Sequence, residues 1–182
     1  MYKNVSKAKK LCKKIHTNAV YIPFDEEKPY YEHCFAVAEI IKTHVKEKID
    51  FDYACTLAYL HDSIEDTDVT YDYLLKEFGK NVADGVFALT KNKEIPYENQ
   101  IEDSVVRIKK LGKNEVAITK MADRSCNLLT IPDFWSYEKA KYYLQDAMLI
   151  YEELKFSSSS LANFLNSKIE AYREQIKDRF GK

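Results

Sequence analysis

The sequence predicts an all-α fold, a bundle of roughly eight to ten helices. Only four glycines and four prolines punctuate the 182 residues, so few positions force a turn. Alternation of apolar and polar residues with a period of two is scarce, whereas the clearest apolar segments repeat at helical spacing. Because 46% of the residues are hydrophobic, the chain can bury a substantial core, and we expect one domain over residues 1–182.

The expected helices follow one another along the chain, with ends defined to within several residues. They span residues 5–19, 30–48, 52–65, 70–78, 81–90, 98–111, 114–127, 136–154 and 159–178. Gly79 and Gly112 fit as C-terminal caps, since glycine tolerates the backbone that ends many helices. Ser136 fits as an N-cap. The serine run over residues 157–160 is expected to form the turn between the last two helices.

The charge balance excludes some partners. The chain has 28 basic and 29 acidic residues, so no overall positive field would attract DNA or RNA. No apolar run approaches the ~20 residues of a membrane span, and the first residues lack the apolar core of a signal peptide. We therefore expect a cytoplasmic chain that binds neither DNA nor membranes, and the sequence leaves its oligomeric state open.

Cysteines, tyrosines and two histidines receive ordinary structural interpretations. The cysteines are far apart and form no CxxC pair, so we expect reduced, mostly buried thiols at Cys12, Cys34, Cys55 and Cys126. Tyrosines are expected at the edge of the core with their hydroxyls on polar partners, namely Tyr30, Tyr53, Tyr59 and Tyr143. His16 and His44 belong to no pattern, and we expect both at the surface.

The segment LAYLHDSIEDTD, residues 57–68, carries the clearest functional signal. An apolar helical run ends there in one histidine and four carboxylates: His61, Asp62, Glu65, Asp66 and Asp68. The C-terminal end of a helix carries partial negative charge, so each acid there costs up to about 1 kcal/mol. A divalent cation among the acids would remove this cost. The segment therefore predicts a metal site.

His61 and Asp62 project about 100° apart on a helix, so further ligands must come from elsewhere. His33 lies in a helix whose apolar residues would turn it inward. Asp123 lies in the apolar stretch VAITKMADRSCNLL, where an unpartnered carboxylate is costly. A single inward histidine is more often a hydrogen-bonded core residue than a ligand, but the combination with the acidic helix end favours a metal centre.

In this order, His33, His61-Asp62 and Asp123 resemble the H...HD...D pattern of HD-type metal-dependent phosphohydrolases. The strings PYYEHCFAVAEII, AYLHDSIEDTDVTYDYLLKEFG, ALTK and TKMADRSCNL are similar to the hydrolase domain of RelA/SpoT alarmone enzymes, especially the small stand-alone hydrolases. The similarity runs from about residue 28 to residue 154. The resemblance implies an HD-domain helical bundle.

The resemblance further implies that His33, His61, Asp62 and Asp123 bind one divalent ion, most often Mn(II). Glu65 and Asp66 match the catalytic acidic pair of the family. On a continuous helix Glu65 would stand one turn beyond His61 and could orient or deprotonate a water. Asp66 would support that role or act as a general acid. The alternative is that both acids merely solvate a helix end.

Four further residues are candidates for substrate contact. A helix through residues 114–127 would place Lys120, Asp123 and Asn127 on roughly one face, an arrangement that suits phosphate. Thr130 falls where the family has a polar nucleotide contact. Arg124 matches the ADR string of the family, with a structural ion pair as an equally good alternative.

The implied activity is a manganese-dependent 3′-pyrophosphohydrolase that converts (p)ppGpp to GDP or GTP and pyrophosphate. The segment before His33 departs from the family, because it contains no arginine and has Asp25, Glu26 and Glu27 in place of basic residues. Leu129 also replaces a family arginine. These departures keep two alternatives open: hydrolysis of another 2′- or 3′-phosphorylated nucleotide or of a pyrophosphorylated tRNA end, and a non-catalytic binding module.

Overall fold

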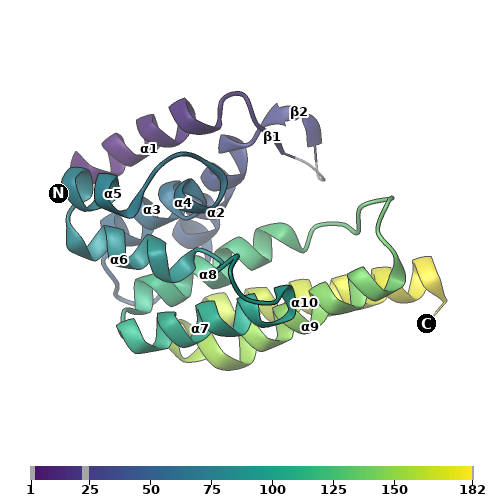
Figure 1. Cartoon of the computed structure of the whole chain (residues 1–182). Helices are drawn as coiled ribbons and strands as arrows, with labels where there is room; N and C mark the ends of the chain where they lie inside the picture. The colour runs from purple at the N-terminus through teal and green to yellow at the C-terminus, as the bar shows by residue number, and fades with distance from the viewer. Residues whose placement is uncertain (1–2, 22–24, 182) are drawn as a thin grey trace.

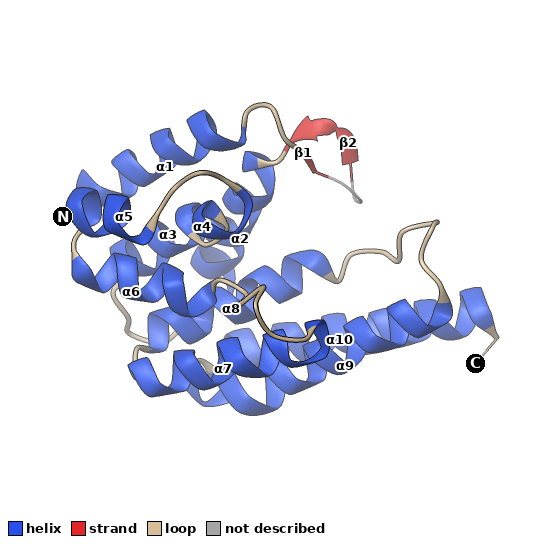
Figure 2. Cartoon of the chain, in the orientation of Figure 1, coloured by secondary structure: helices blue, strands red, loops and turns tan. Residues whose placement is uncertain are grey.

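The computed structural model describes residues 3–21 and 25–181. Over these residues the chain forms ten α-helices, two 3₁₀ turns and one small hairpin (Figures 1 and 2). The helices are α1 (Lys3–His16), α2 (Tyr31–His44), α3 (Phe51–Leu60), α4 (Ser63–Asp66), α5 (Tyr71–Phe78), α6 (Lys80–Leu89), α7 (Gln100–Leu111), α8 (Asn114–Asn127), α9 (Tyr137–Leu154) and α10 (Ser159–Phe180). The 3₁₀ turns are η1 (Tyr97–Asn99) and η2 (Lys155–Ser157). The predicted all-α fold is confirmed.

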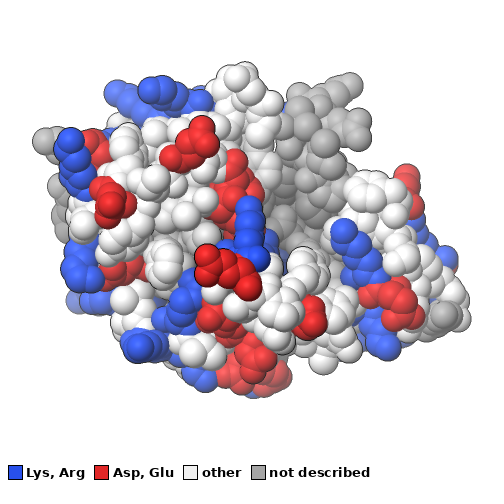
Figure 3. All heavy atoms as spheres, in the orientation of Figure 1, with Lys and Arg blue, Asp and Glu red and all other residues white. Residues whose placement is uncertain are grey.

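The hairpin joins α1 to α2. Strand β1 (Val20–Tyr21) pairs antiparallel with β2 (Asp25–Pro29), and the register shifts between Val20 and Tyr21. Nothing in the described part of the chain is long and apolar enough to form a membrane-crossing helix. Basic and acidic side chains are interspersed on the face shown in Figure 3, in keeping with the balanced composition.

Helix α8 lies in the centre of the molecule. It contacts α2, α3 and α6 on one side and α7, α9 and α10 on the other, and Figure 1 shows it passing between these two groups. Its side chains from residue 116 to residue 122 are all buried. Because α8 is packed from both sides, its C-terminal half carries Lys120 and Asp123 into the middle of the fold.

The predicted caps are confirmed. The Ser136 hydroxyl accepts a hydrogen bond from the Lys139 N–H at the start of α9. Gly79 (φ 86°) ends α5 and Gly112 (φ 65°) ends α7, and both adopt positive φ values that favour glycine. The serine run expected as a turn contributes η2 and the first turn of α10.

The helix expected over residues 52–65 is broken, and this prediction was wrong in its second half. Helix α3 ends at Leu60, and α4 begins only at Ser63. Asp62 (φ −94°, ψ 1°) has left the helical conformation, and the Ser63 hydroxyl donates to the carbonyl of Leu60 at 2.6 Å. A serine hydroxyl that donates a hydrogen bond to a backbone carbonyl at a helix end competes with continuation of the helix. Glu65 is therefore not on the same helix as His61.

Helices α3 and α6 approach each other closely at Gly85. A Cβ atom at this position would lie 2.7 Å from Leu57 Cδ2 and 2.8 Å from the Tyr53 hydroxyl oxygen. Tyr53 cannot move freely, because its hydroxyl donates to the carbonyl of Asn81 at 2.8 Å. The absence of a side chain at residue 85 thus allows α6 to pack against α3.

The cysteine prediction is confirmed, since all four cysteines are free and buried. The prediction for His16 was wrong: its side chain is only 1% exposed. His16 lies four residues after the buried Cys12, so the two side chains share the inward face of α1. His44 is partly exposed and stacks on Phe164, with 3.7 Å between the ring centroids.

Candidate active site

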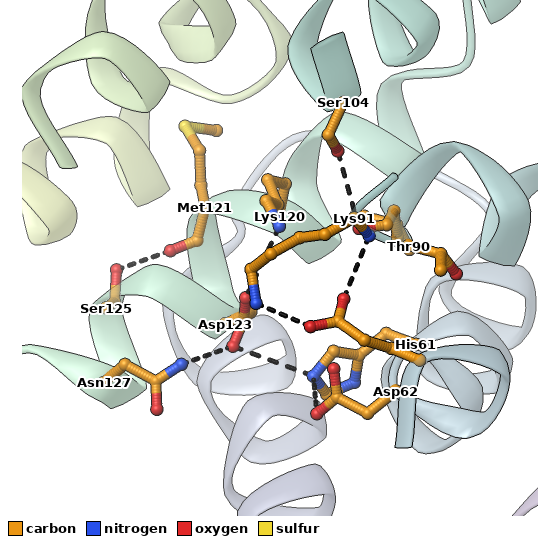
Figure 4. Close-up of polar contacts among 12 residues, drawn as sticks. His61, Asp62, Thr90, Lys91, Ser104, Lys120, Met121, Asp123, Ser125 and Asn127 are labelled. Atoms are coloured by element: carbon orange, nitrogen blue, oxygen red, sulfur yellow. Dashed lines mark hydrogen bonds and ion pairs between the residues drawn. The ribbon is translucent and has the colours of Figure 1, made fainter. Parts of the chain in front are cut away.

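Side chains from α2, from the end of α3 and from α8 converge. His33 of α2, His61 and Asp62 at the end of α3, and Asp123 of α8 form what we call the His–Asp cluster, part of which is shown in Figure 4. His61 Nε2 lies 2.8 Å from Asp62 Oδ2 and 3.7 Å from Asp123 Oδ1. His33 Nε2 lies 3.2 Å from Asp123 Oδ1 and 3.7 Å from Asp62 Oδ2. The two Nε2 atoms are 3.3 Å apart.

The donor atoms of the cluster fit one metal ion. His61 Nδ1 is 2.9 Å from the Ala58 carbonyl oxygen, so Nδ1 carries a proton and Nε2 is the nitrogen that faces the two carboxylates. Once Nε2 has lost its own proton, it can bind a cation together with these carboxylates. Ligands about 2.1 Å from one ion lie roughly 3.0–3.4 Å from each other. The distances from the two Nε2 atoms to each other and to the carboxylate oxygens, 2.8–3.7 Å, are close to this range. Two imidazoles and two carboxylates therefore form a suitable site for a divalent ion.

The electrostatics of the cluster also favour positive charge. Burial alone would lower the pKa of His33, but its bonds to Asp123 and Cys126 and the charge of Asp123 raise the pKa to about 9. The pKa of His61 is likewise raised, against its burial, by Asp62 and Asp123. Despite their own burial, the two carboxyl groups have pKa values held below the usual range by the histidines. Both carboxylates are thus ionised and attract a cation.

Two neighbours hold the carboxylates in place. The Tyr30 hydroxyl donates to Asp62 Oδ2 at 2.7 Å, and Asn127 Nδ2 donates to Asp123 Oδ1 at 2.6 Å. Hydrogen bonds of this kind orient metal ligands. The expectation that the Tyr30 hydroxyl reaches a polar partner is confirmed. Asn127, predicted as a phosphate contact, instead donates to the Asp123 carboxylate in this structure.

Glu65 lies at the edge of the cluster and is held by a lysine that sequence reasoning missed. Lys91 Nζ is 2.6 Å from Glu65 Oε1, and the Lys91 backbone N–H donates to Oε2 at 3.0 Å. Lys91 follows the end of α6, far from Glu65 in the sequence. The only sequence signal for it was the last letter of the ALTK string. Two contacts with Lys91 therefore fix the position of the Glu65 carboxyl group.

Asp66 follows Glu65 and is open to solvent in part. Partial desolvation, together with the charges of Asp62 and Glu65, raises the pKa of the Asp66 carboxyl to about 6. A carboxyl group with a pKa near neutrality can hold a proton and release it, as a general acid must.

A small hollow opens beside Asp123, and we call it the cationic hollow. Its lining includes Lys91, Lys120, Arg124, Asn127, Tyr143 and Asp146. Arg124 is 4% exposed, and its guanidinium lies 4.1 Å above the Tyr143 ring. In the described part of the chain, Arg124 Nε and Nη1 have no hydrogen-bond partner. Lys120 is 5% exposed, and its Nζ lies 3.9 Å from Asp123 Oδ2. A buried guanidinium with free donors, as at Arg124, is suited to an anion.

The sequence of the chain matches the model of the HD domain family over residues 8–156. The chain belongs to the HD domain family. All four residues of the His–Asp cluster lie within the matched range.

Relatives of the HD-domain chain include proteins named guanosine-3′,5′-bis(diphosphate) 3′-pyrophosphohydrolase MESH1. The Danio rerio protein is 29% identical over 140 residues, which cover 75% of this chain and 76% of the relative. The Homo sapiens protein is 28% identical over 146 residues, which cover 77% and 79%. The bifunctional (p)ppGpp synthase/hydrolase SpoT of Escherichia coli K12 is 30% identical over 131 residues, but these cover only 18% of that longer protein.

A solved structure confirms the HD-domain fold. It is described as a metazoan ortholog of SpoT that hydrolyzes ppGpp, and it superposes with a TM-score of 0.81 over 95% of this chain and 97% of that chain. Its sequence identity is 22%, so the likeness concerns the fold.

One predicted substrate contact lies outside the assembled site. Thr130 is exposed and lines a different hollow with Gln175 and Arg179, because α8 ends at Asn127 and the chain turns away. The segment with Asp25, Glu26 and Glu27 departs from the family in having acidic residues in place of basic ones. The side chains of residues 20–27 lie outside the described part of the HD-domain chain. Of the predicted substrate contacts, the structure groups Lys120, Arg124 and Asn127 around Asp123.

Proposed function

We propose that residues 1–182 form one HD-type domain that acts as a metal-dependent (p)ppGpp 3′-pyrophosphohydrolase. The substrate is a small phosphorylated nucleotide, and the products are GDP or GTP and pyrophosphate. The observation that carries this proposal is the position of the cationic hollow beside Asp123. A buried guanidinium with two unpaired donors, at Arg124, next to a candidate metal centre suits a phosphate group that is both bound and attacked. The names of the relatives support the choice of nucleotide.

Mn(II) is the proposed ion. Two imidazoles and two carboxylates suit a borderline metal such as manganese, iron or zinc, with His33, His61, Asp62 and Asp123 as the ligands. When bound, such an ion lowers the pKa of a coordinated water and offsets the charge of the reacting phosphate.

The residues around the ion divide the proton transfers between them. Glu65 accepts a proton from the attacking water, and Lys91 holds its carboxylate in position. The bond between phosphorus and the 3′-oxygen of the nucleoside breaks, and Asp66 donates a proton to that oxygen. The raised pKa of Asp66 allows it to carry this proton near neutrality. Lys120 and Arg124 bind the departing diphosphate.

A second candidate keeps the chemistry and changes the substrate. The segment over residues 17–32 contains no arginine to stack on guanine. Another 2′- or 3′-phosphorylated nucleotide or a pyrophosphorylated tRNA end would not need that arginine. A non-catalytic binding module is the remaining alternative.

Metal analysis followed by an assay of pyrophosphate release with Mn(II) tests these candidates. The panel contains ppGpp, pppGpp, their adenine counterparts and 3′-phosphorylated nucleotides, with Asp123→Ala as the inactive control. We expect ppGpp hydrolysis with modest discrimination between guanine and adenine. A clear preference for a non-guanine substrate would replace the first candidate by the second. A guanine preference above about a thousandfold, roughly 4 kcal/mol, would reveal a base-recognition element that we have missed. Metal binding without any turnover would support the binding module.

A further inference from the structure

A second group of metal-ligating side chains lies between α1 and α2. It consists of Cys12 and His16 of α1 and Cys34 of α2, and we call it the Cys–His cluster. One ligand atom from each residue lies within 4.8 Å of the other two. All three residues are buried, with exposed fractions of 0%, 1% and 0%. None of them belongs to the His–Asp cluster.

Ordinary packing does not account for His16. Buried cysteines behave as small hydrophobic residues and need no partner. A buried imidazole does, yet His16 Nε2 has no hydrogen-bond partner among residues 3–21 and 25–181. A buried polar atom without a partner costs about 1–3 kcal/mol. The cost disappears if the imidazole binds a ligand that the two thiols can share.

The residue types and their spacing point to a metal ion. Cys12 and His16 are four residues apart, so they lie one turn apart on the same face of α1. Around one zinc ion, sulfur at about 2.3 Å and nitrogen at about 2.0–2.1 Å lie roughly 3.4–3.8 Å from each other. Because the ligand atoms now lie within 4.8 Å of one another, each pair must close by at most about 1.0–1.4 Å. Thiolate and imidazole ligands select zinc and copper(I) over harder cations.

We propose that Cys12, His16 and Cys34 bind one thiophilic metal ion, with zinc(II) as the expected occupant. Binding releases the two thiol protons and leaves a fourth coordination position for a water. The site rests on these three residues alone and does not depend on the proposed hydrolase activity.

Such an ion would join two helices directly beneath the His–Asp cluster. Cys34 follows His33 in the chain. The His16 and Tyr30 rings have centroids 5.1 Å apart, and the Tyr30 hydroxyl donates to Asp62. The ion would therefore fix α1 against α2 and support the position of two ligands of the His–Asp cluster.

Cobalt(II) substitution tests the site in the full chain under reducing conditions. Cysteine thiolates bound to cobalt give a charge-transfer absorption in the near ultraviolet, whereas the His–Asp cluster has no cysteine among its ligands. We expect this absorption in the wild-type protein at one additional equivalent of cobalt, and displacement of that cobalt by zinc. Cys12→Ser and Cys34→Ser should lose the absorption. Cys55→Ser is the matched control, because Cys55 is buried outside the cluster, and it should keep the absorption, as should Asp123→Ala.

Metal content gives an independent readout. The wild-type chain should retain one more zinc ion than a variant that carries both serine substitutions. Folded, reduced wild-type protein that shows no thiolate absorption overturns the proposal, and this measurement stands even if a variant fails to fold. Absorption that persists in folded Cys12→Ser and Cys34→Ser would equally overturn it.

Discussion

Replacement of Arg124 by methionine tests whether this residue contacts the substrate or has only a structural role. The guanidinium offers two buried donors, Nε and Nη1, that have no partner among the described residues. A hydrogen bond to a charged group contributes about 1.5–3 kcal/mol. Loss of this contribution in the substrate complex should lower kcat/KM by about 10-fold to 150-fold.

The same substitution should leave the stability of the free protein nearly unchanged. Methionine keeps the length of the side chain and removes two unpaired donors, a relief of about 1–3 kcal/mol. It also removes the contact of the guanidinium with Tyr143, about 0.5–2 kcal/mol. The two effects oppose each other, so the free energy of unfolding should stay within about 1 kcal/mol of the wild-type value.

Steady-state kinetics and urea unfolding of the same preparation measure both quantities. Arg173→Met is the control, because Arg173 of α10 is half-buried, pairs with Glu170 and does not line the cationic hollow. The control should change neither quantity. A drop of more than about 3 kcal/mol in the free energy of unfolding, with normal kcat/KM for the folded fraction, would refute our reasoning and make Arg124 a structural residue.

Four further substitutions test the site and the fold. Asp123→Ala should abolish metal retention and activity, as measured by metal analysis and pyrophosphate release; a variant that keeps stoichiometric metal would disprove the ligand assignment. Glu65→Gln should keep the metal and lower kcat by about 100-fold or more, and metal loss would instead mark Glu65 as a ligand. Gly85→Ala should lower the free energy of unfolding by about 1–2 kcal/mol, because overpacking against Leu57 and Tyr53 exceeds the gain in helix propensity. Urea unfolding measures this change, and an unchanged free energy of unfolding would contradict the close approach of α3 and α6. Glu47 accepts hydrogen bonds from Ser158, Ser159 and Ser160. Although partial burial alone would raise the pKa of Glu47, these bonds hold it below the ordinary 4.5. Glu47→Gln should therefore lower the free energy of unfolding by about 1–2 kcal/mol at neutral pH. The stabilisation by ionised Glu47 is complete above the pKa of the unfolded state and disappears as the pH falls through the lower pKa of the folded state. The difference in unfolding free energy between wild type and Glu47→Gln should therefore shrink in acid, and a difference that grows would contradict the prediction.

The sequence allowed the fold and the His–Asp cluster to be predicted because both depend on local signals. Helical periodicity and the caps at Gly112 and Ser136 depend on neighbouring residues only. The ligands could be recognised by the cost of His61, Asp62 and Asp123 in apolar surroundings. This energetic cost can be recognised from the sequence wherever a charged residue interrupts an apolar stretch.

Other features depend on contacts that no local pattern encodes. Lys91 reaches Glu65 only because α4 and α6 pack together, and 26 residues separate the two in the chain. The break before Ser63 depends on one hydroxyl that takes the carbonyl of Leu60. His16 is buried because α1 lies on α3, although the sequence around it is rich in lysine. Tertiary packing decided each of these cases.

The central helix α8 has a further consequence for how the site can evolve. Lys120, Asp123, Arg124 and Asn127 all lie within two turns of this one helix. Each residue advances about 1.5 Å along the helix axis, so the helix itself sets the distance between the proposed metal ligand Asp123 and the cations proposed to bind phosphate. Changes in the hairpin or in the loop after α8 leave this distance intact. Recognition of the base can therefore drift while the spacing that governs hydrolysis is preserved.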